Sequence, residues 1–312
     1  MMLFPFFFVC LALPWTGAAV AQDAGADTAP LRFVATGVAE EYRFDTGQLR
    51  GVFREGGRSI GLLPVEHGST GTPMARQPGI LGYYRIFTTN HRYGESARVL
   101  PSTAKALPGG GIEVHWEAAD DRPYELTGVY RWTAADTLDL DTVVTAHGEL
   151  PDFEVFLASY LSEHFPATSV YVKEPPSAPG APGFMTAEEA NGHWQVYPRD
   201  AAALAIVQDG RWTIPPSPVD WAVMPVMAGP LAFRRDPETG LVMVFMAPPE
   251  DCFAVFTPCR GDAHYSVYLA LFGRTLKNGE TVRARSRLLV RDDITDEQIV
   301  ALYDAYVSGT AK

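Results

Sequence analysis

The polar side chains best suited to chemistry recur at alternate positions in the segment 261–274. This segment reads GDAHYSVYLALFGR and has the apolar content of a core strand. Because side chains alternate along a strand, His264, Ser266 and Tyr268 project from one face. An imidazole, a hydroxyl and a phenol in one row can bind a sugar or transfer protons, so we expect His264 and Tyr268 to be catalytic.

A second polar group ends a strand-like segment at 83–95. Strand alternation places Arg85 and His91 on one face, aimed at the same ligand. Loops at sheet ends often carry sites, so we expect His91 to be catalytic and Arg85, Asn90 and Arg92 to bind substrate. The alternative is a solvated hairpin end with ordinary hydrogen bonds.

A third candidate segment, 152–165, fits either a strand or a helix. As a strand it aligns Glu154, Tyr160 and His164 on one face, and as a helix it presents a plain apolar core stripe. The neighbouring strand-like segments favour the strand. We expect Tyr160 and His164 to contact substrate, and the alternative is a buried tyrosine and histidine with their hydrogen bonds satisfied.

Tryptophan, arginine and aspartate are concentrated between residues 194 and 221. Tryptophan rings stack on sugar rings, while arginine and aspartate hydrogen-bond hydroxyl groups. We expect substrate contacts from five residues here: Trp194, Arg199, Asp209, Arg211 and Trp212. The alternative is structural, with tryptophans in the core and the charged groups paired across turns.

Other catalytic signatures are absent from the sequence. The seven histidines include no close pair at zinc-ligand spacing, so we expect no metal and no cofactor, although His67, His91, His164 and His264 could still converge in space. There is no Gly-x-Ser-x-Gly elbow and no glycine-rich phosphate loop. Two facing carboxylates of a glycosidase would have to come from Glu154, Glu163, Asp209 or Asp220.

The amino-terminal 21 residues carry no Asp, Glu, Lys or Arg, and Ala19-Val20-Ala21 is a small-residue cleavage site. The pattern predicts a signal peptide at 1–21 and a secreted or periplasmic mature protein, with a retained membrane anchor as the alternative. The remaining 22–312 is long enough for one large core or two modest domains, and we expect a single β-sandwich domain. In it, the Pro/Gly-rich stretch 174–183 is expected to be an exposed loop.

The cysteine content predicts a disulfide, and the net charge limits the classes of partner that the protein can bind. Once Cys10 leaves with the signal, Cys252 and Cys259 are the only cysteines, and in an oxidising compartment they predict one local disulfide. The net charge of −12 disfavours nucleic acid and strongly anionic polysaccharides, unless a local arginine cluster overrides it. A poly- or oligosaccharide is the expected partner.

Short alternating segments separated by turn signals fill the chain from residue 31 to 290, and Asn278-Gly279 marks a tight hairpin. A single helix is expected at 294–307, where Thr295 and Gln298 form a capping box. The fold class is therefore all-β, a large two-sheet antiparallel β-sandwich with one C-terminal helix.

The order of these features resembles the galactose-mutarotase-like β-sandwich superfamily. The resemblance lies in the opening 47–52, the paired segments 130–132 and 138–140, and the closing hairpin from 271–274 to 287–290. The chain is also similar to exported bacterial proteins that share this sandwich. The resemblance implies a supersandwich fold and the activities of its members, which include sugar epimerases, polysaccharide lyases and accessory domains of glycosidases.

Two main functions follow. The first is an enzyme on a neutral or weakly acidic glycan, a lyase, hydrolase or isomerase, with His91, His264 and Tyr268 as acid–base groups. In a lyase, Arg85 or Arg92 would neutralise a uronate carboxylate. The second is a non-catalytic glycan-binding module that stacks tryptophans on sugars, and a scaffold with no ligand is a third possibility.

Overall fold

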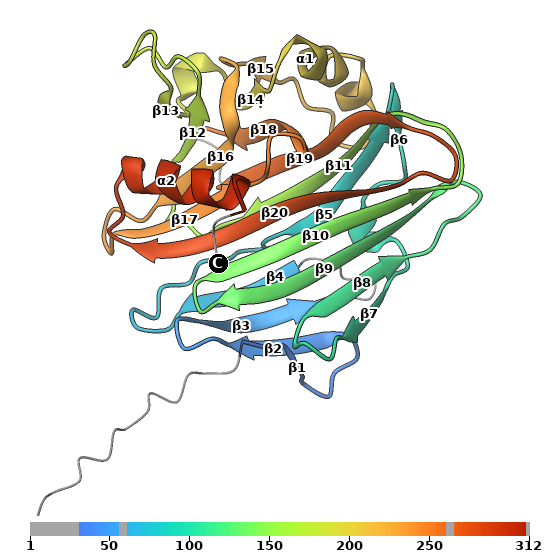
Figure 1. Cartoon of the computed structure of the whole chain (residues 1–312), viewed down its shortest axis with the longest axis horizontal. Coiled ribbons are helices and arrows are strands. Elements are labelled where there is room, and N and C mark those ends of the chain that lie inside the picture. The colour runs from blue at the N-terminus through green and yellow to red at the C-terminus, as the bar shows by residue number, and fades with distance from the viewer. Residues whose placement is uncertain (1–30, 56–60, 260–264, 310–312) are drawn as a thin grey trace, which may run out of the picture.

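The computed structural model describes residues 31–55, 61–259 and 265–309, and most of the regular secondary structure in them is antiparallel strand. Two large sheets face each other and a smaller sheet joins their core (Figure 1). This confirms the expected all-β sandwich. None of the helices in these residues is long and apolar enough to cross a membrane.

The nine-stranded sheet forms one layer. Its strands, in spatial order, are β13 (Gly183–Thr186), β12 (Thr168–Val172), β16 (Met227–Arg235), β17 (Leu241–Met246), β20 (Thr281–Asp292), β10 (Thr137–Ala146), β9 (Tyr124–Ala134), β8 (Ile112–Trp116) and β7 (Thr103–Ala106). The exposed loop 174–183 connects β12 to its neighbour β13. The Asn278-Gly279 turn leads into β20, as the sequence predicted.

The seven-stranded sheet forms the other large layer. Its order is β15 (Ala222–Val223), β14 (Trp194–Pro198), β18 (Cys252–Pro258), β19 (Ser266–Leu276), β11 (Leu150–Tyr160), β5 (Gly82–Thr88) and β6 (His91–Arg92). Only the short β14–β15 pair is parallel. The four-stranded sheet contains β1 (Val34–Ala35), β2 (Glu41–Asp45), β3 (Leu49–Arg54) and β4 (Gly61–His67).

The main core fills the space between the sheets. Every other side chain of β11 and β19, for example Val155 and Leu269, points into it and packs with residues of the nine-stranded sheet such as Leu138 and Leu288. The side chains between them, for example Phe156 and Tyr268, point the other way and belong to a second apolar cluster on the outer side of the seven-stranded sheet. Both faces of this sheet are therefore buried, which explains why its strands are so rich in apolar residues.

Helix α2 (Asp296–Val307) packs on the outer face of the nine-stranded sheet (Figure 1). Its capping box forms as expected: Thr295 Oγ1 accepts from the Gln298 amide, and the Gln298 side chain accepts from the Thr295 amide. Ile299 and Tyr303 face the sheet and are buried. The helix predicted at 294–307 is confirmed, shorter by two residues at its start.

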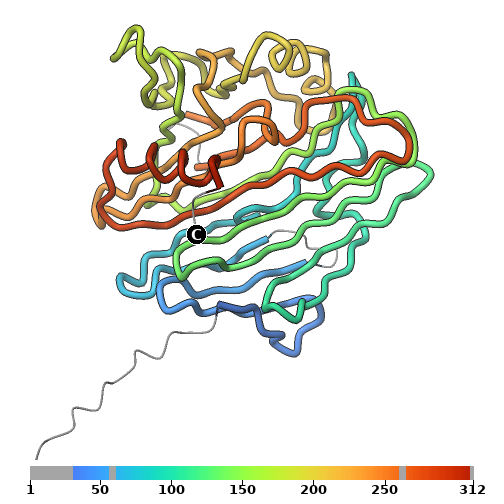
Figure 2. The backbone as a smooth tube through the Cα atoms, in the orientation of Figure 1, coloured from blue at the N-terminus to red at the C-terminus, as the bar shows by residue number. Residues whose placement is uncertain are grey.

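A second, shorter helix escaped sequence analysis. Helix α1 (Ala201–Val207) is capped by Asp200, whose carboxylate accepts from the Ala203 amide at 2.8 Å. Together with the chain that follows, it covers the outer face of the seven-stranded sheet, and this part of the chain is yellow in Figure 2. Three short 3-10 turns complete the described elements: Ala97–Val99, Glu189–Asn191 and Arg211–Thr213.

The predicted disulfide is wrong. Cys252 opens β18 and Cys259 follows its last residue, and both are buried free thiols. Seven extended residues at about 3.3 Å each separate their Cα atoms by about 23 Å, whereas a disulfide needs about 7 Å or less. Cys259 instead lies beside His193, with 3.6 Å between Sγ and Nδ1. The expectation failed because it took the intervening residues for a loop.

Both thiols should therefore react when the protein is unfolded without reductant. Alkylation in denaturant followed by mass spectrometry is expected to label Cys252 and Cys259 fully, and a reductant is expected to leave the melting temperature unchanged. A disulfide would contribute about 2–4 kcal/mol, enough to lower the melting temperature by several degrees on reduction. Thiols that become reactive only after reduction would contradict the fold.

Candidate functional site

A cavity of about 230 Å³, here called the aromatic pocket, lies on the outer face of the seven-stranded sheet. Arg85, Phe156, Tyr160 and Tyr268 form its floor, from the adjacent strands β5, β11 and β19. The other lining residues are Tyr84, Trp194, Trp212, Ser217, Pro218, Val219 and Trp221. The chain segment 208–221, here called the roof segment, thus closes a sheet face that would otherwise be open.

A β-bulge in β5 brings two neighbouring side chains to the pocket. Arg85 pairs with Phe156 and Tyr83 pairs with Leu157, so Tyr84 is an extra residue opposite no partner. Tyr83 points into the main core, whereas Tyr84 and Arg85 both line the pocket. A regular strand would have put Tyr84 and Arg85 on opposite faces, and bulges often re-aim side chains in this way.

Tyr268 is the buried hydroxyl group of the floor. It is 3% exposed, stacks on Phe156 with ring centroids 4.7 Å apart, and accepts a 2.7 Å hydrogen bond from Ser266 Oγ. Burial raises the pKa of Tyr268 well above its ordinary value, and the nearby Tyr160 adds to this. The phenol therefore stays protonated at neutral pH, where it can donate a hydrogen bond and cannot act as a base.

Arg85 is the charged group of the floor. It is 3% exposed and its Nη2 donates to the Ser217 carbonyl at 2.8 Å and to the Tyr84 hydroxyl at 3.2 Å. Its Nε and Nη1 atoms are buried without a hydrogen-bond partner among the described residues. The guanidinium also lies over the Trp212 ring, 5.2 Å from the ring centroid. Arg85 thus holds the roof segment and presents charge to the cavity.

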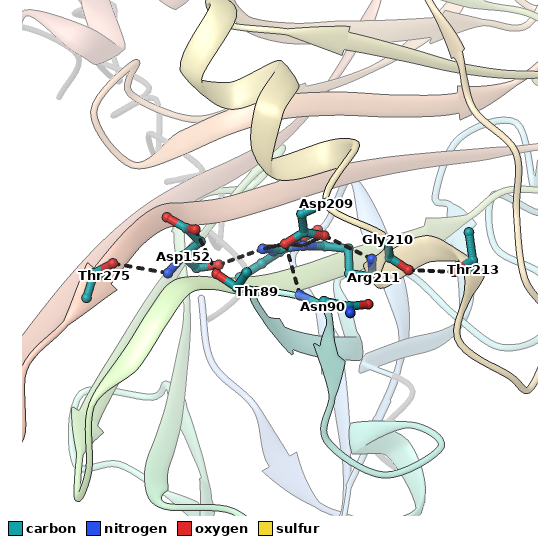
Figure 3. A network of polar contacts seen from close by, with 9 residues as sticks. Thr89, Asn90, Asp152, Asp209, Gly210, Arg211, Thr213 and Thr275 are labelled. Carbon is teal, nitrogen blue, oxygen red and sulfur yellow. Dashed lines mark hydrogen bonds and ion pairs between the residues drawn. The ribbon is translucent and has the colours of Figure 1, made fainter.

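A buried ion-pair network anchors the start of the roof segment (Figure 3). Arg211 is fully buried and donates to Glu154 Oε2 of β11 at 2.8 Å, to the Asp152 carbonyl at 3.0 Å, and to both carboxylate oxygens of Asp209. Asp209 in turn accepts from the backbone amide of Asn90, at the turn between β5 and β6. The network therefore ties the roof segment to two strands at once.

Glu154 is an unusual carboxylate because it is fully buried. Burial raises its pKa to about 7, and the charge of Arg211 and its hydrogen bond oppose a further rise. Its Oε1 atom has no partner among the described residues. A carboxylate in this position is tolerated only because a guanidinium faces it directly.

The far end of the roof segment is held by backbone contacts. Arg92 Nη1 donates to the Pro216 carbonyl at 2.7 Å, beside the bond from Arg85 to Ser217. Just after the segment, the Met224 amide donates to the Val196 carbonyl of β14, while the Val219 amide donates to the Trp212 carbonyl within the segment itself. The segment is thus fixed to the sheet at both ends.

The structure brings five predicted site residues together in the aromatic pocket: Arg85, Tyr160, Trp194, Trp212 and Tyr268. Four others hold the roof segment or its anchor and do not line the cavity: Asn90, Arg92, Asp209 and Arg211. Their expected substrate contacts stay predictions.

The remaining predicted residues lie elsewhere. His164 is 3.8 Å from Asp236, and Arg199 pairs with Asp200 and donates to the Pro249 carbonyl. His264 falls outside the described residues. Among the described residues, no cluster of three or more His, Cys, Asp or Glu side chains could hold a metal ion.

His91 and Arg85 do not share a face, contrary to the alternation expected along 83–95. The chain turns back at Thr89 and Asn90, so Arg92 pairs with Phe87 and lies on the pocket side of the sheet. His91 is exposed, and its ring contacts Tyr93, which belongs to the main core. A tight turn resets the alternation, and the sequence pattern did not reveal it.

Sequence reasoning missed Tyr84, Phe156 and Arg98 as residues of this site. Phe156 had a visible signal, since it shares the strand face of Glu154 and Tyr160. Tyr84 depends on the bulge. Arg98 lies over the rings of Tyr84 and Tyr160, at 4.3 and 5.1 Å, and no motif marks it.

Comparisons with known proteins agree on the fold. The alpha-N-acetylgalactosaminidase NagBb from Bifidobacterium bifidum, in complex with GalNAc, matches at 14% identity and a TM-score of 0.53, over 86% of this chain and 39% of that one. The Slr1438 protein from Synechocystis matches at 13% identity and a TM-score of 0.50, over 80% of this chain and 95% of that one. A galactose mutarotase related enzyme from Lactobacillus acidophilus matches at 9% identity and a TM-score of 0.48, over 82% of this chain and 99% of that one.

The galactose-mutarotase-like fold is therefore confirmed. No family model matches the sequence, and no curated protein matches it. Identities this low show the fold alone, and the chain spans well under half of the acetylgalactosaminidase.

Removal of the Arg211 guanidinium should destabilise the protein severely, because Glu154 would be left buried and uncompensated. We expect Arg211→Met to lower the free energy of unfolding by about 3–5 kcal/mol in urea titrations, and Glu154→Leu in the same chain to restore much of it. Arg274→Met is the control, since its pair with Glu280 is solvent-exposed and contributes about 1 kcal/mol at most. Equal losses for Arg211→Met and the control would refute the anchoring role.

Proposed function

We propose that this protein is a carbohydrate-active protein that seats a sugar ring in the aromatic pocket. The observation that carries the proposal is the gathering of Trp194, Trp212, Trp221 and Tyr268 around one cavity that also contains a charged Arg85 side chain. Aromatic faces pack against the apolar face of a sugar ring, and a few polar groups fix its orientation. The volume of about 230 Å³ suits a single ring better than a chain of them.

The fold supports a sugar ligand by analogy. NagBb is an alpha-N-acetylgalactosaminidase whose structure holds GalNAc, and the mutarotase related enzyme is named for a sugar reaction. A shared fold does not by itself carry a function, so the weight rests on the pocket.

Tyr268 is the residue of the pocket suited to chemistry on a bound sugar. Its raised pKa keeps the proton on the phenol at neutral pH, so Tyr268 can hydrogen-bond a glycosidic or ring oxygen and transfer the proton only as negative charge develops on that oxygen. In this role the protein is a lyase, hydrolase or isomerase, and the described lining residues do not include a matching base.

A specific observation favours the second candidate, a glycan-binding module without turnover. The lining residues within 31–55, 61–259 and 265–309, the parts of the chain that the structure describes, include no carboxylate and no imidazole. Acid–base catalysis at a sugar ordinarily uses a second group beside the proton donor. In the module, the tryptophans and Arg85 bind and Tyr268 only hydrogen-bonds.

Export of the protein is part of this proposal, and it rests on the uncharged, apolar first 21 residues. We expect the mature chain to begin at Gln22 and to be found outside the cytoplasm. Amino-terminal mass spectrometry on fractionated cells of a bacterial expression host tests this. An intact amino terminus in the cytoplasmic fraction would contradict export.

Sugar binding should depend on the exposed aromatic wall of the pocket. In calorimetric titrations with a panel of mono- and oligosaccharides, Trp194→Ala should weaken binding by about 1–2 kcal/mol, because it removes a stacking face. Tyr268→Phe keeps the ring and should leave binding within a few-fold, while reducing any turnover by about 10²-fold or more. Phe184→Ala is the control. This half-buried aromatic residue packs with helix α2 on the outer face of the nine-stranded sheet, away from the aromatic pocket.

The outcomes separate the candidates. Turnover that Tyr268→Phe abolishes supports the enzyme. Binding without turnover over the whole panel supports the module. Binding that survives Trp194→Ala unchanged would place the sugar elsewhere and defeat the proposal.

A further inference from the structure

The aromatic pocket lies within a cluster of three arginines, Arg85, Arg92 and Arg98, that are not directly paired with an acidic side chain in the described part of the chain. Arg85 lines the cavity, Arg92 lies on the same face of the sheet and is 8% exposed, and Arg98 lies over two lining rings. None of the three forms an ion pair in the described part of the chain. The side-chain hydrogen bonds of Arg85 and Arg92 go to the Tyr84 hydroxyl and to the backbone carbonyls of Glu95, Pro216 and Ser217.

The nearest buried carboxylates are already paired with another arginine, Arg211. Glu154 and Asp209 both bind Arg211, and Arg85 is only the last of the influences on Glu154. Burial and the positive charge of Arg85 lower the pKa of Arg92, as expected where like charges crowd together. A buried charge without a partner costs free energy. A negatively charged ligand bound beside the arginine cluster would reduce this cost.

With the acceptor Glu154 Oε1 set apart, because it does not line the cavity, the unpaired polar atoms of the described lining residues and of Arg92 and Arg98 are all hydrogen-bond donors. They are Nε and Nη1 of Arg85, Nε of Arg92, Nε and Nη2 of Arg98, and the indole nitrogens of Trp212 and Trp221. None of the lining residues that the structure describes is acidic. A ligand rich in acceptor oxygens fits this arrangement, and an anionic one also neutralises the guanidinium charge.

From these observations we infer that the pocket selects a sugar bearing a negatively charged group, a carboxylate or a sulfate, which is neutralised by Arg85 with added charge from Arg98. The inference rests on the proposed function and names the substrate class of the same site. It also explains how a chain with a net charge of −12 can bind an acidic sugar, because the arginine cluster is local.

NMR titration of the full chain provides the test, with the indole N–H resonances as reporters. Sodium glucuronate is compared with glucuronamide, its neutral counterpart of similar shape, and glucose 6-sulfate is compared with glucose. We expect the charged member of at least one pair to bind about tenfold or more tightly, as for a charge-assisted hydrogen bond. The pair that shows the preference identifies the carboxylate or the sulfate.

Variants assign the preference to the cluster. Arg85→Gln should reduce the charged-over-neutral ratio to about one, and Arg98→Gln should reduce it a few-fold. Arg85→Gln removes bonds that hold the roof segment and could misfold, so Arg98→Gln is the second variant: the Nε and Nη2 atoms of Arg98 have no hydrogen-bond partner in the described part of the chain. Arg274→Gln, an exposed arginine of β19, is the matched control and should leave the ratio unchanged.

Failure of the inference and failure of the proposed function give different results. Neutral and charged sugars that bind equally well would overturn the selection for charge and leave sugar binding intact. Acetate or sulfate that binds as tightly as the charged sugars would show an anion site without sugar recognition, and would overturn the inference. If no sugar shifts any indole resonance, both fail.

Discussion

The site of this protein depends on one buried interaction, the ion pair between Arg211 and Glu154. Both side chains are fully buried, 2.8 Å apart, on the outer side of a sheet whose other face already forms the main core. A buried pair of this kind adds little stability compared with an apolar contact, but it fixes geometry. Here it fixes where the chain leaves helix α1 and crosses the sheet.

Once the crossing is fixed, the rest of the pocket follows. Trp212 is the next residue after Arg211 and inserts between Phe87 and Phe156 of the sheet. The segment then passes over Arg85 and Arg92, which bind its carbonyl groups, and returns through Trp221 to β15. The arginines that hold the roof segment in place also supply the positive charge near the cavity. The same side chains therefore form the pocket and determine which ligands it can bind.

Much of the architecture could be predicted from the sequence, because strand alternation and turn residues are local signals. The all-β class, the capped helix near the C-terminus and the strand character of β11 all came from such patterns. Five of the expected ligand contacts also lie in one cavity, although they come from parts of the chain far apart in sequence. Alternation predicted that Ser266 and Tyr268 share a face, and their 2.7 Å hydrogen bond agrees.

Interruptions of the regular strand alternation could not be predicted from the sequence. The bulge at Tyr84 and the tight turn at Asn90 each shift alternation by one residue, and each moves a side chain to the other face. The failed disulfide has the same origin, since spacing alone does not distinguish an extended strand from a loop. The role of Arg211 needed three-dimensional contacts, because Glu154 is 57 residues away.

Amide hydrogen exchange on the unliganded protein tests most directly whether the roof segment is fixed over the sheet. The Val219 and Met224 amides, which donate to Trp212 and Val196, are predicted to exchange far more slowly than the exposed loop 174–183. Exchange at both amides as fast as in that loop would mean that the segment is not held down. The aromatic pocket would then not exist as a formed site.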